Sequence, residues 1–356
     1  MEKPVVFIRN FEAGIYLESF LVAAVASLLA IRLFLQITGY PQIGGGELHI
    51  AHMLWGGLLM LASIITLLSF LSKASARLAA ILGGIGFGTF IDEVGKFVTS
   101  DHNYFFQPAV ALIYVTFILI YLATRAIQTK RNYSPQEYLV NALREMEEAA
   151  LHDLDEEERG RSLLYLERSS PDNPLVASLR DSLARTAAVP VPTNPWQLTR
   201  IKLFVKSLYH YVSGFWWFPL IVVAFFVAQL IINVVYAFVL VFFIGLGWEQ
   251  ILDVRVVRAV AERMKNLSFT DSAELGSSLL SGFFVLCGVI RIQRSKLLAF
   301  RMFERSILVS IFLTQVFAFY KEQFSALLGL FLNIAVLIAL QFMIDRERLK
   351  AVTSDK

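Results

Sequence analysis

Long apolar runs dominate this chain and constrain its fold more than any other feature. A helix needs about 20 apolar residues to cross the hydrocarbon core of a bilayer. Eight stretches meet this requirement: 16–37, 48–72, 77–97, 105–126, 214–246, 272–291, 300–320 and 325–344. Because 56% of the 356 residues are hydrophobic and only 17% are charged, the composition is that of a membrane protein. The sequence predicts an all-α, polytopic integral membrane bundle of about eight transmembrane helices.

A polar segment, residues 127–213, separates two groups of four apolar runs. The pattern Ser-Pro-Gln-Glu that begins at Ser134 is a capping box with proline at the first helical position. The acidic run 155–158 favours a second short helix, and the prolines that follow favour a third. We expect three parts, namely an N-terminal membrane half, a small cytoplasmic helical insert with its linker, and a C-terminal membrane half. Their ranges are 1–126, 127–213 and 214–356.

Positive charge in the short connections predicts the orientation of the bundle. Residues 38–47 and 98–104 contain no Lys or Arg, whereas Lys73 and Arg77 flank the second connection. Because Lys and Arg favour the cytoplasmic side, we expect both termini in the cytoplasm and the protein in the cell (inner) membrane. We expect the first apolar run to stay on the protein as an anchor. Residues 248–271 are the exception, since they are basic and would lie outside; their pattern suits an amphipathic surface helix.

Ionisable residues lie near the ends of the first three apolar runs. Such residues are costly at membrane depth, so they usually face a protein interior or a water-filled cavity and mark a site or a pathway. In the expected orientation they all fall in the outer half of the membrane or just beyond it. They are Arg32, His49, His52, Asp92, Glu93, Lys96, Asp101 and His102. We predict that most of them share one outward-facing cavity.

Glycine spacing on the third predicted helix indicates how this cavity forms. Four positions, each four residues apart, lie on one face of that helix: Gly84, Gly88, Asp92 and Lys96. Glycine lets a neighbouring helix approach closely, and Gly56 and Gly57 on the second helix are the natural counterparts. We therefore expect the second and third helices to pack tightly and to carry the polar groups into the cavity.

Ion or small-solute translocation is the leading hypothesis for these polar groups. Asp92 and Glu93 would titrate as they bind the ion or proton, and His49, His52 and Lys96 would tune them. Arg32 and Asp101 complete the expected binding site. The first alternative is that the same charges only fix helix packing, because residues near helix ends can reach the interface.

A membrane-embedded enzyme at the outer leaflet is the second alternative, and it would use either a bound metal or a carboxylate with a raised pKa near the histidines for acid–base chemistry. His49 and His52 are three residues apart on one helix face, so they can chelate one divalent metal such as zinc or iron. Glu93 would supply an oxygen ligand. The motifs HExxH, CxxC and GxSxG are absent from the sequence. The metal hypothesis therefore depends on one histidine pair and one carboxylate.

The stretch 137–158 contains nine acidic residues and one basic residue. A solvated helix face is its simplest interpretation. The alternative is that it docks on the basic residues of 291–305, or that residues 134–188 bind a cytoplasmic partner. The chain would in that case be a membrane scaffold or sensor. The expected partners are otherwise the lipid bilayer and a small ion or solute, since no nucleic-acid motif appears.

Two stretches of the sequence resemble stretches of other proteins. HIAHMLWGG at 49–57 and GFGTFIDEVGKFVTSDHNYFFQP at 86–108 resemble an uncharacterised group of bacterial multi-pass membrane proteins. The likeness covers the first four predicted spans. It implies a polytopic membrane protein of prokaryotic origin, and it implies no activity and no functional residues.

Overall fold

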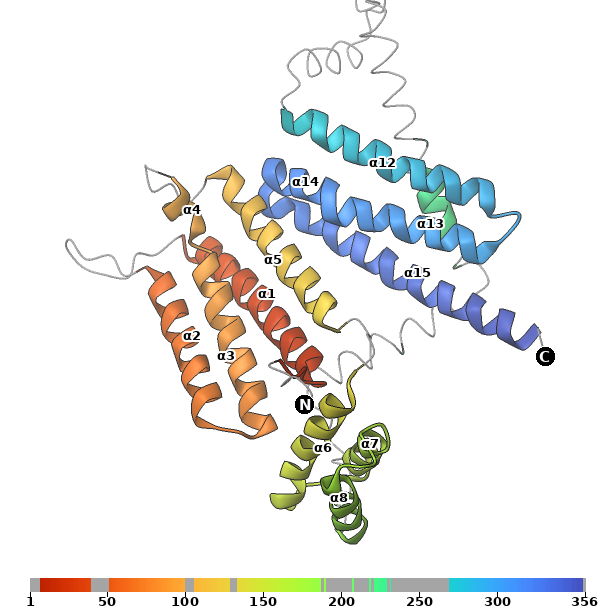
Figure 1. The fold of residues 1–356 in the computed structure, drawn as a ribbon. Helices are drawn as coiled ribbons and strands as arrows, with labels where there is room; N and C mark the ends of the chain where they lie inside the picture. The colour runs from red at the N-terminus through yellow and green to blue at the C-terminus, as the bar shows by residue number, and fades with distance from the viewer. Residues whose placement is uncertain are drawn as a thin grey trace, which may run out of the picture. The chain divides into compact units, whose positions relative to one another are not determined.

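A computed structural model describes most of the chain (Figure 1). The described residues are 7–39, 51–99, 106–128, 133–186, 189, 207, 218, 221–228, 231 and 269–354. All named elements in them are helices, which confirms the predicted all-α class. The chain forms two compact units. The first comprises residues 1–104 and 116–195, and the second comprises residues 105–115 and 196–356.

Six helical stretches in the described part are long and apolar enough to cross a membrane, which indicates a membrane protein. They are Ala13–Thr38, His52–Ser69, Lys73–Ile91, Pro108–Ile127, Thr270–Arg291 and Lys296–Glu347. The last stretch reverses at Gln323, where φ is 52° and ψ is −131°. It therefore contains both predicted spans 300–320 and 325–344. Most of 214–246 and of 248–271 lies outside the described residues, so the total of eight spans stays a prediction.

Three long helices form the membrane part of the first unit. They are α1 (Ala13–Thr38), α2 (His52–Ser69) and α3 (Lys73–Ile91). Helix α3 lies between the other two and packs against both (Figure 1). The chain passes through α1 in one direction, through α2 in the opposite direction and through α3 in the first direction again. The end of α1, the start of α2 and the end of α3 therefore lie together.

Glycines allow α3 to approach both neighbours closely. A Cβ atom on Gly84 or Gly88 would lie within 3.0 Å of a backbone oxygen of α1, and one on Gly56 would lie 2.6 Å from the backbone oxygen of Gly86. Tight packing of the second and third predicted helices is thus confirmed at Gly56. The predicted partner of the Gly84 stripe was wrong, because the stripe packs on α1, and the Cβ position of Gly57 faces open space. Spacing defines a helix face without defining its neighbour.

The third predicted span, 77–97, is not one continuous helix. Helix α3 begins after Ser72, whose hydroxyl accepts a hydrogen bond from the Ser75 amide, and it ends at Ile91. A short helix, α4 (Val94–Val98), follows a break. Asp92 and Glu93 form this break, and other helices bind their side chains.

The polar segment folds into three short helices after α5 (Gln107–Gln128). They are α6 (Pro135–Ala150), α7 (Glu156–Glu167) and α8 (Pro174–Arg185). The predicted capping box at Ser134 is confirmed, and a second one begins at Asp155. Buried aliphatic residues from the three helices and their connections pack together, so this α6–α8 module has its own small core. Its buried residues are Leu139, Ala142, Leu154, Leu166, Val176 and Leu183.

The described helices of the second unit form a bundle with an aromatic centre. They are α12 (Phe269–Arg291), α13 (Lys296–Val309), α14 (Gln315–Glu322) and α15 (Leu327–Ser354), with a π-helical turn at Ser310–Thr314 and a 3₁₀ turn at Gln323–Ala326. The rings of Phe226 and Phe303 stack at 4.6 Å between centroids. Both side chains are fully buried, so this stack is the centre of the core.

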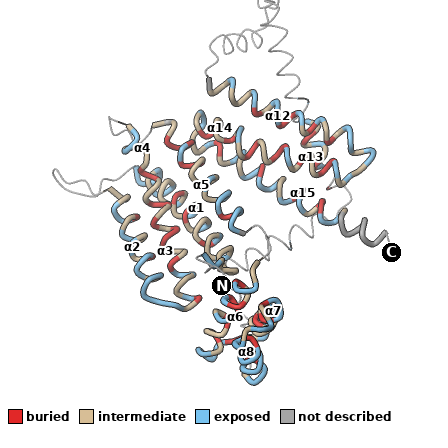
Figure 2. Tube along the Cα trace, viewed as in Figure 1, coloured by how far each residue is buried: buried red, intermediate tan, exposed pale blue. Residues whose placement is uncertain are grey.

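Many large apolar residues of the long helices are exposed. Figure 2 marks the exposed positions along these helices in pale blue. On α2, Leu58, Leu61 and Ile65 are each more than half exposed, at 55%, 51% and 53%. A continuous apolar face of this kind is an aggregation liability in water and is suited to lipid. Burial thus agrees with the composition in placing these helices in a membrane.

Candidate functional site

Five of the predicted site residues meet where the end of α1, the start of α2 and the end of α3 lie together. We call this group the Asp92 cluster. It consists of Arg32, His52, Asp92, Glu93 and Lys96. His49 and Asp101 lie outside the described residues, as does His102.

Asp92 is fully buried and is bound from two other helices. The Arg32 guanidinium of α1 donates through Nε to Oδ1, and through Nη2 to the backbone oxygen of Asp92 at 3.0 Å. The other carboxylate oxygen, Oδ2, lies 3.1 Å from Nε2 of His52, the first residue of α2. Asp92 therefore links all three helices at this end.

Glu93 is also fully buried, and its carboxylate caps the first turn of α2. Lys96 Nζ contacts Oε1, and the Met53 amide donates to Oε2 at 3.0 Å. The N-cap residue of α2 is Ala51, which has no polar side chain. Because the first amides of a helix lack intrahelical partners, Glu93 acts as a capping carboxylate supplied by another segment.

His52 lies between the two carboxylates. Its Nε2 atom faces Asp92, and its Nδ1 atom lies 3.5 Å from Oε2 of Glu93. The His52 side chain is 23% exposed, whereas neither acidic side chain has any exposure. The imidazole is thus the part of this three-residue arrangement that reaches the surface of the described structure.

Because these charges are buried, each of them requires an opposite charge next to it. Removing one partner from a buried ion pair leaves an uncompensated charge and typically destabilises a protein by about 3–5 kcal/mol. Arg32 balances Asp92 and Lys96 balances Glu93. Loss of any one of these charges would therefore destabilise the three-helix arrangement.

The predicted zinc or iron site stays a prediction, because His49, one of its three proposed ligands, lies outside the described residues. Among the described residues, no group of three or more His, Cys, Asp or Glu residues could hold a metal. Both ring nitrogens of His52 face carboxylates, and the ammonium group of Lys96 occupies one oxygen of Glu93. A metal ion at Glu93 would also meet the repulsion of that ammonium group.

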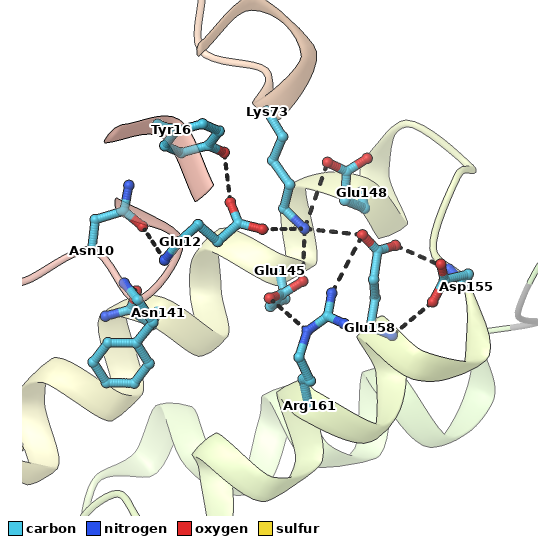
Figure 3. A network of polar contacts seen from close by, with 11 residues as sticks. Asn10, Glu12, Tyr16, Lys73, Asn141, Glu145, Glu148, Asp155, Glu158 and Arg161 are labelled. Carbon is cyan, nitrogen blue, oxygen red and sulfur yellow. Dashed lines mark hydrogen bonds and ion pairs between the residues drawn. The ribbon is translucent and has the colours of Figure 1, made fainter. Parts of the chain in front are cut away.

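A second polar group, which the sequence analysis did not identify, lies at the opposite end of α3. We call it the Lys73 hub. It consists of Glu12, Lys73, Glu145, Glu148, Glu158 and Arg161 (Figure 3). The sequence analysis used Lys73 only as an orientation signal, and it assigned the acidic stretch 137–158 to a solvated helix face or to docking on 291–305 or a cytoplasmic partner. The sequence signal that could have indicated this contact is the opposite charge of Lys73 and the stretch 137–158.

Lys73 reaches from α3 into the α6–α8 module. Its ammonium nitrogen lies 2.7 Å from Glu145 and 3.1 Å from Glu158, and 3.7 Å from both Glu12 and Glu148 (Figure 3). Only 9% of Lys73 is exposed. Arg161 adds a second cation beside two of the same carboxylates, at 3.5 and 3.6 Å.

The segment before α1 is held by the same module. The Arg9 guanidinium donates to both carboxylate oxygens of Glu137, at 2.6 and 2.8 Å. Asn141 accepts from the Phe11 amide at 3.0 Å and donates to the backbone oxygen of Arg9 at 2.9 Å. The Phe11 ring lies 5.1 Å from the ring of Tyr165 on α7. The hydrogen bonds to Arg9 hold the pKa of the Glu137 carboxyl at about 2.

Described polar residues of the second unit, among them Gln315 and Asn333, form hydrogen bonds between helices and turns. Gln315 donates to the backbone oxygen of Ala326 at 2.7 Å, and Asn333 donates to the hydroxyl of Ser310 at 3.2 Å. Lys321 pairs with acidic residues at the start of α12. These contacts fix helix packing.

Comparisons of the chain with protein-family models, with curated proteins and with solved structures found no match.

Proposed function

We propose that this chain translocates protons, or a small ion coupled to protons, across a cell membrane. The Asp92 cluster would be the binding site. The observation that carries the proposal is the position of His52, whose two ring nitrogens face two different buried carboxylates. Ionisable groups enclosed in a membrane bundle typically belong to such pathways.

An imidazole in this position is suited to proton transfer. It can accept a proton at one ring nitrogen and release a proton from the other, and its unperturbed pKa lies near neutrality. In His52 one nitrogen faces Asp92 and the other faces Glu93. Nε2 can therefore accept a proton from Asp92 while Nδ1 releases one to Glu93. This transfer leaves the ring in its other tautomer, which rotation of the ring or return of a proton must reset before the next transfer.

Two cations of the cluster pair with its carboxylates. Arg32 contacts Asp92 and Lys96 contacts Glu93, and a proton that binds to either carboxylate would weaken its ion pair. Proton uptake would thereby loosen the contacts that join α1, α2 and α3. This links occupancy of the site to helix movement, which transport requires.

For the orientation we propose both termini and the α6–α8 module in the cytoplasm and the Asp92 cluster on the outer side of an inner membrane. The distribution of Lys and Arg in the connections supports this choice. We also propose eight spans in total, of which 214–246 is the fifth along the chain. The cluster would then receive protons from outside the cell.

Proton flux into proteoliposomes tests the proposal. Purified protein is reconstituted with a pH-sensitive dye inside, and a potassium diffusion potential drives uptake. We expect flux in the wild type and loss of most of it in Glu93→Gln and in His52→Gln, which remove a proton-binding group with little change in volume. Glu156→Gln is the matched control, because Glu156 is 70% exposed on α7.

Two outcomes would contradict the proposal. One is wild-type flux no greater than that of empty liposomes with protons, sodium or potassium as the driven ion. The other is unchanged flux in both cluster variants. Circular dichroism and monodisperse gel filtration of each variant separate a loss of function from a loss of folding.

A further inference from the structure

We infer that the α6–α8 module is a latch that regulates the Asp92 cluster from the opposite end of the membrane helices. The module holds α1 and α3 together at one end, and the Asp92 cluster joins the same two helices at the other. Release of the module would loosen the cluster. The consequence for transport rests on the proposed function, whereas the mechanical coupling can be measured without it.

The module binds α1 and α3 through separate contacts. Arg9 and Phe11, just before α1, are bound by Glu137 and Asn141 of α6. Lys73, the first residue of α3, is bound by carboxylates of α6 and α7. One small folded domain therefore fixes the relative position of two membrane helices at their starts.

Helices α1 and α3 connect the module at one end to the Asp92 cluster at the other. From Glu12 to Arg32, and from Lys73 to Asp92, the distance along each helix axis is about 30 Å, at 1.5 Å per residue. That length matches the hydrocarbon core of a bilayer. The ion pair between Arg32 and Asp92 closes the far end of the same helix pair.

Close packing between α1 and α3 allows these two helices little independent movement. A Cβ atom at Gly84 or Gly88 would lie within 3.0 Å of backbone atoms of α1, so the two helices are in contact along this part of their length. Packed helices shift between discrete arrangements more readily than they deform. A change at the Lys73 end is thus expected to reach Asp92 as a small rotation or translation of α3 against α1.

Charge balance makes the hub suitable as a releasable contact. It contains four carboxylates and two cations, Lys73 and Arg161. Three of those carboxylates belong to α6 and α7. Lys73 is the cation that α3 contributes, so its removal would leave an excess of partly buried negative charge facing the inner end of α3. Anything that neutralises or competes for Lys73 would therefore release the module from α3.

The experiment measures docking and coupling separately. Nitroxide labels at Ala74 and Ser178, both exposed, report the distance between α3 and α8 in a Cys287→Ala background. Hydrogen exchange of peptide 51–58 reports the cluster, because the Met53 amide is bound to Glu93. The test variant is Lys73→Gln. Arg185→Gln, at an exposed residue of α8, removes the same charge outside the hub.

We expect Lys73→Gln to broaden the label distance distribution and to raise exchange of peptide 51–58 by about tenfold, which corresponds to about 1.4 kcal/mol of local opening. Arg185→Gln should change neither. The double variant Glu145→Gln with Glu158→Gln should give the same result as Lys73→Gln, and it leaves α1–α3 unaltered if the single variant fails to fold.

Two results would overturn the latch. In the first, the distance distribution stays narrow in both hub variants. In the second, it broadens while exchange of peptide 51–58 stays at the wild-type rate. Neither readout uses transport, so a protein that moves no protons can still show the coupling. A protein that moves protons without the coupling would refute the latch alone.

Discussion

Arg32 and Asp92, 60 residues apart, are joined by two hydrogen bonds that involve different parts of the aspartate. The guanidinium binds the carboxylate and also the backbone oxygen. A carbonyl near the end of a helix lacks an intrahelical partner, so Arg32 both neutralises the side chain and caps α3. This double role explains why an arginine, rather than a lysine, suits the position.

Replacing Arg32 tests that double role. Arg32→Gln leaves the buried Asp92 charge uncompensated, so we expect a loss of about 3–5 kcal/mol in stability. Arg32→Lys keeps the charge but not the forked geometry, so its loss should be smaller. Proteolysis of detergent-solubilised protein across a denaturant series measures both. Equal stability of the wild type and Arg32→Gln would show that the pair contributes nothing.

Two glycine variants test the helix contacts. Gly88→Ala introduces a methyl group within 3.0 Å of the α1 backbone, so we expect destabilisation of about 1–3 kcal/mol from overpacking. Gly57→Ala is the matched control, because its Cβ position faces open space. Alanine there should be neutral or stabilising by about 0.5–1 kcal/mol. The thermal midpoints of the two variants would coincide if the α1–α3 contact were loose.

Acid should detach the α6–α8 module from the segment before α1. Arg9 lowers the pKa of Glu137 from 4.5 to about 2, so this carboxylate contributes to docking at pH values above 4.5. The contribution is lost as pH falls from 4.5 toward 2. We expect a label on the N-terminal segment to become mobile over that range, and Glu137→Gln to be mobile already at neutral pH. An unchanged spectrum in that variant at pH 7 would contradict the assignment.

The pH dependence that Glu148 contributes should have the opposite sign to that of Glu137. Burial raises its pKa, the nearby charges of Glu158, Asp153 and Glu147 raise it further, and Lys73 opposes them. Because the folded chain holds this proton more tightly than the unfolded chain, the free energy of unfolding falls as pH rises above the ordinary carboxyl pKa. Glu148→Gln removes that dependence. The thermal midpoint measured against pH should therefore be flatter in the variant, and an identical profile would refute the role of Glu148.

Periodicity and capping chemistry were sufficient to predict most helices of the described chain. The apolar runs have the length of membrane spans, and the capping box at Ser134 marks the start of α6. Local signals of this kind depend on residues a few positions apart. The convergence of Asp92 with Arg32 and His52 followed from the alternating direction of the first three helices.

Tertiary contacts were harder to predict. The Gly84 stripe packs on α1, although the second helix offered two glycines as partners. The Lys73 hub was missed because a basic residue in a short connection is ordinarily a topology signal. An acidic stretch likewise is ordinarily solvated. Opposite charges 72 residues apart do not reveal that they meet, since many arrangements of the α6–α8 module fit the same pattern.

The central claim is that the carboxylates bridged by His52 bind a proton and release it. Infrared difference spectra between acidic and neutral pH measure this directly, through the stretching band of a protonated buried carboxyl. We predict that the wild type gains this band on acidification and that Asp92→Asn or Glu93→Gln removes or shifts it. Identical difference spectra for the wild type and both variants would contradict the account.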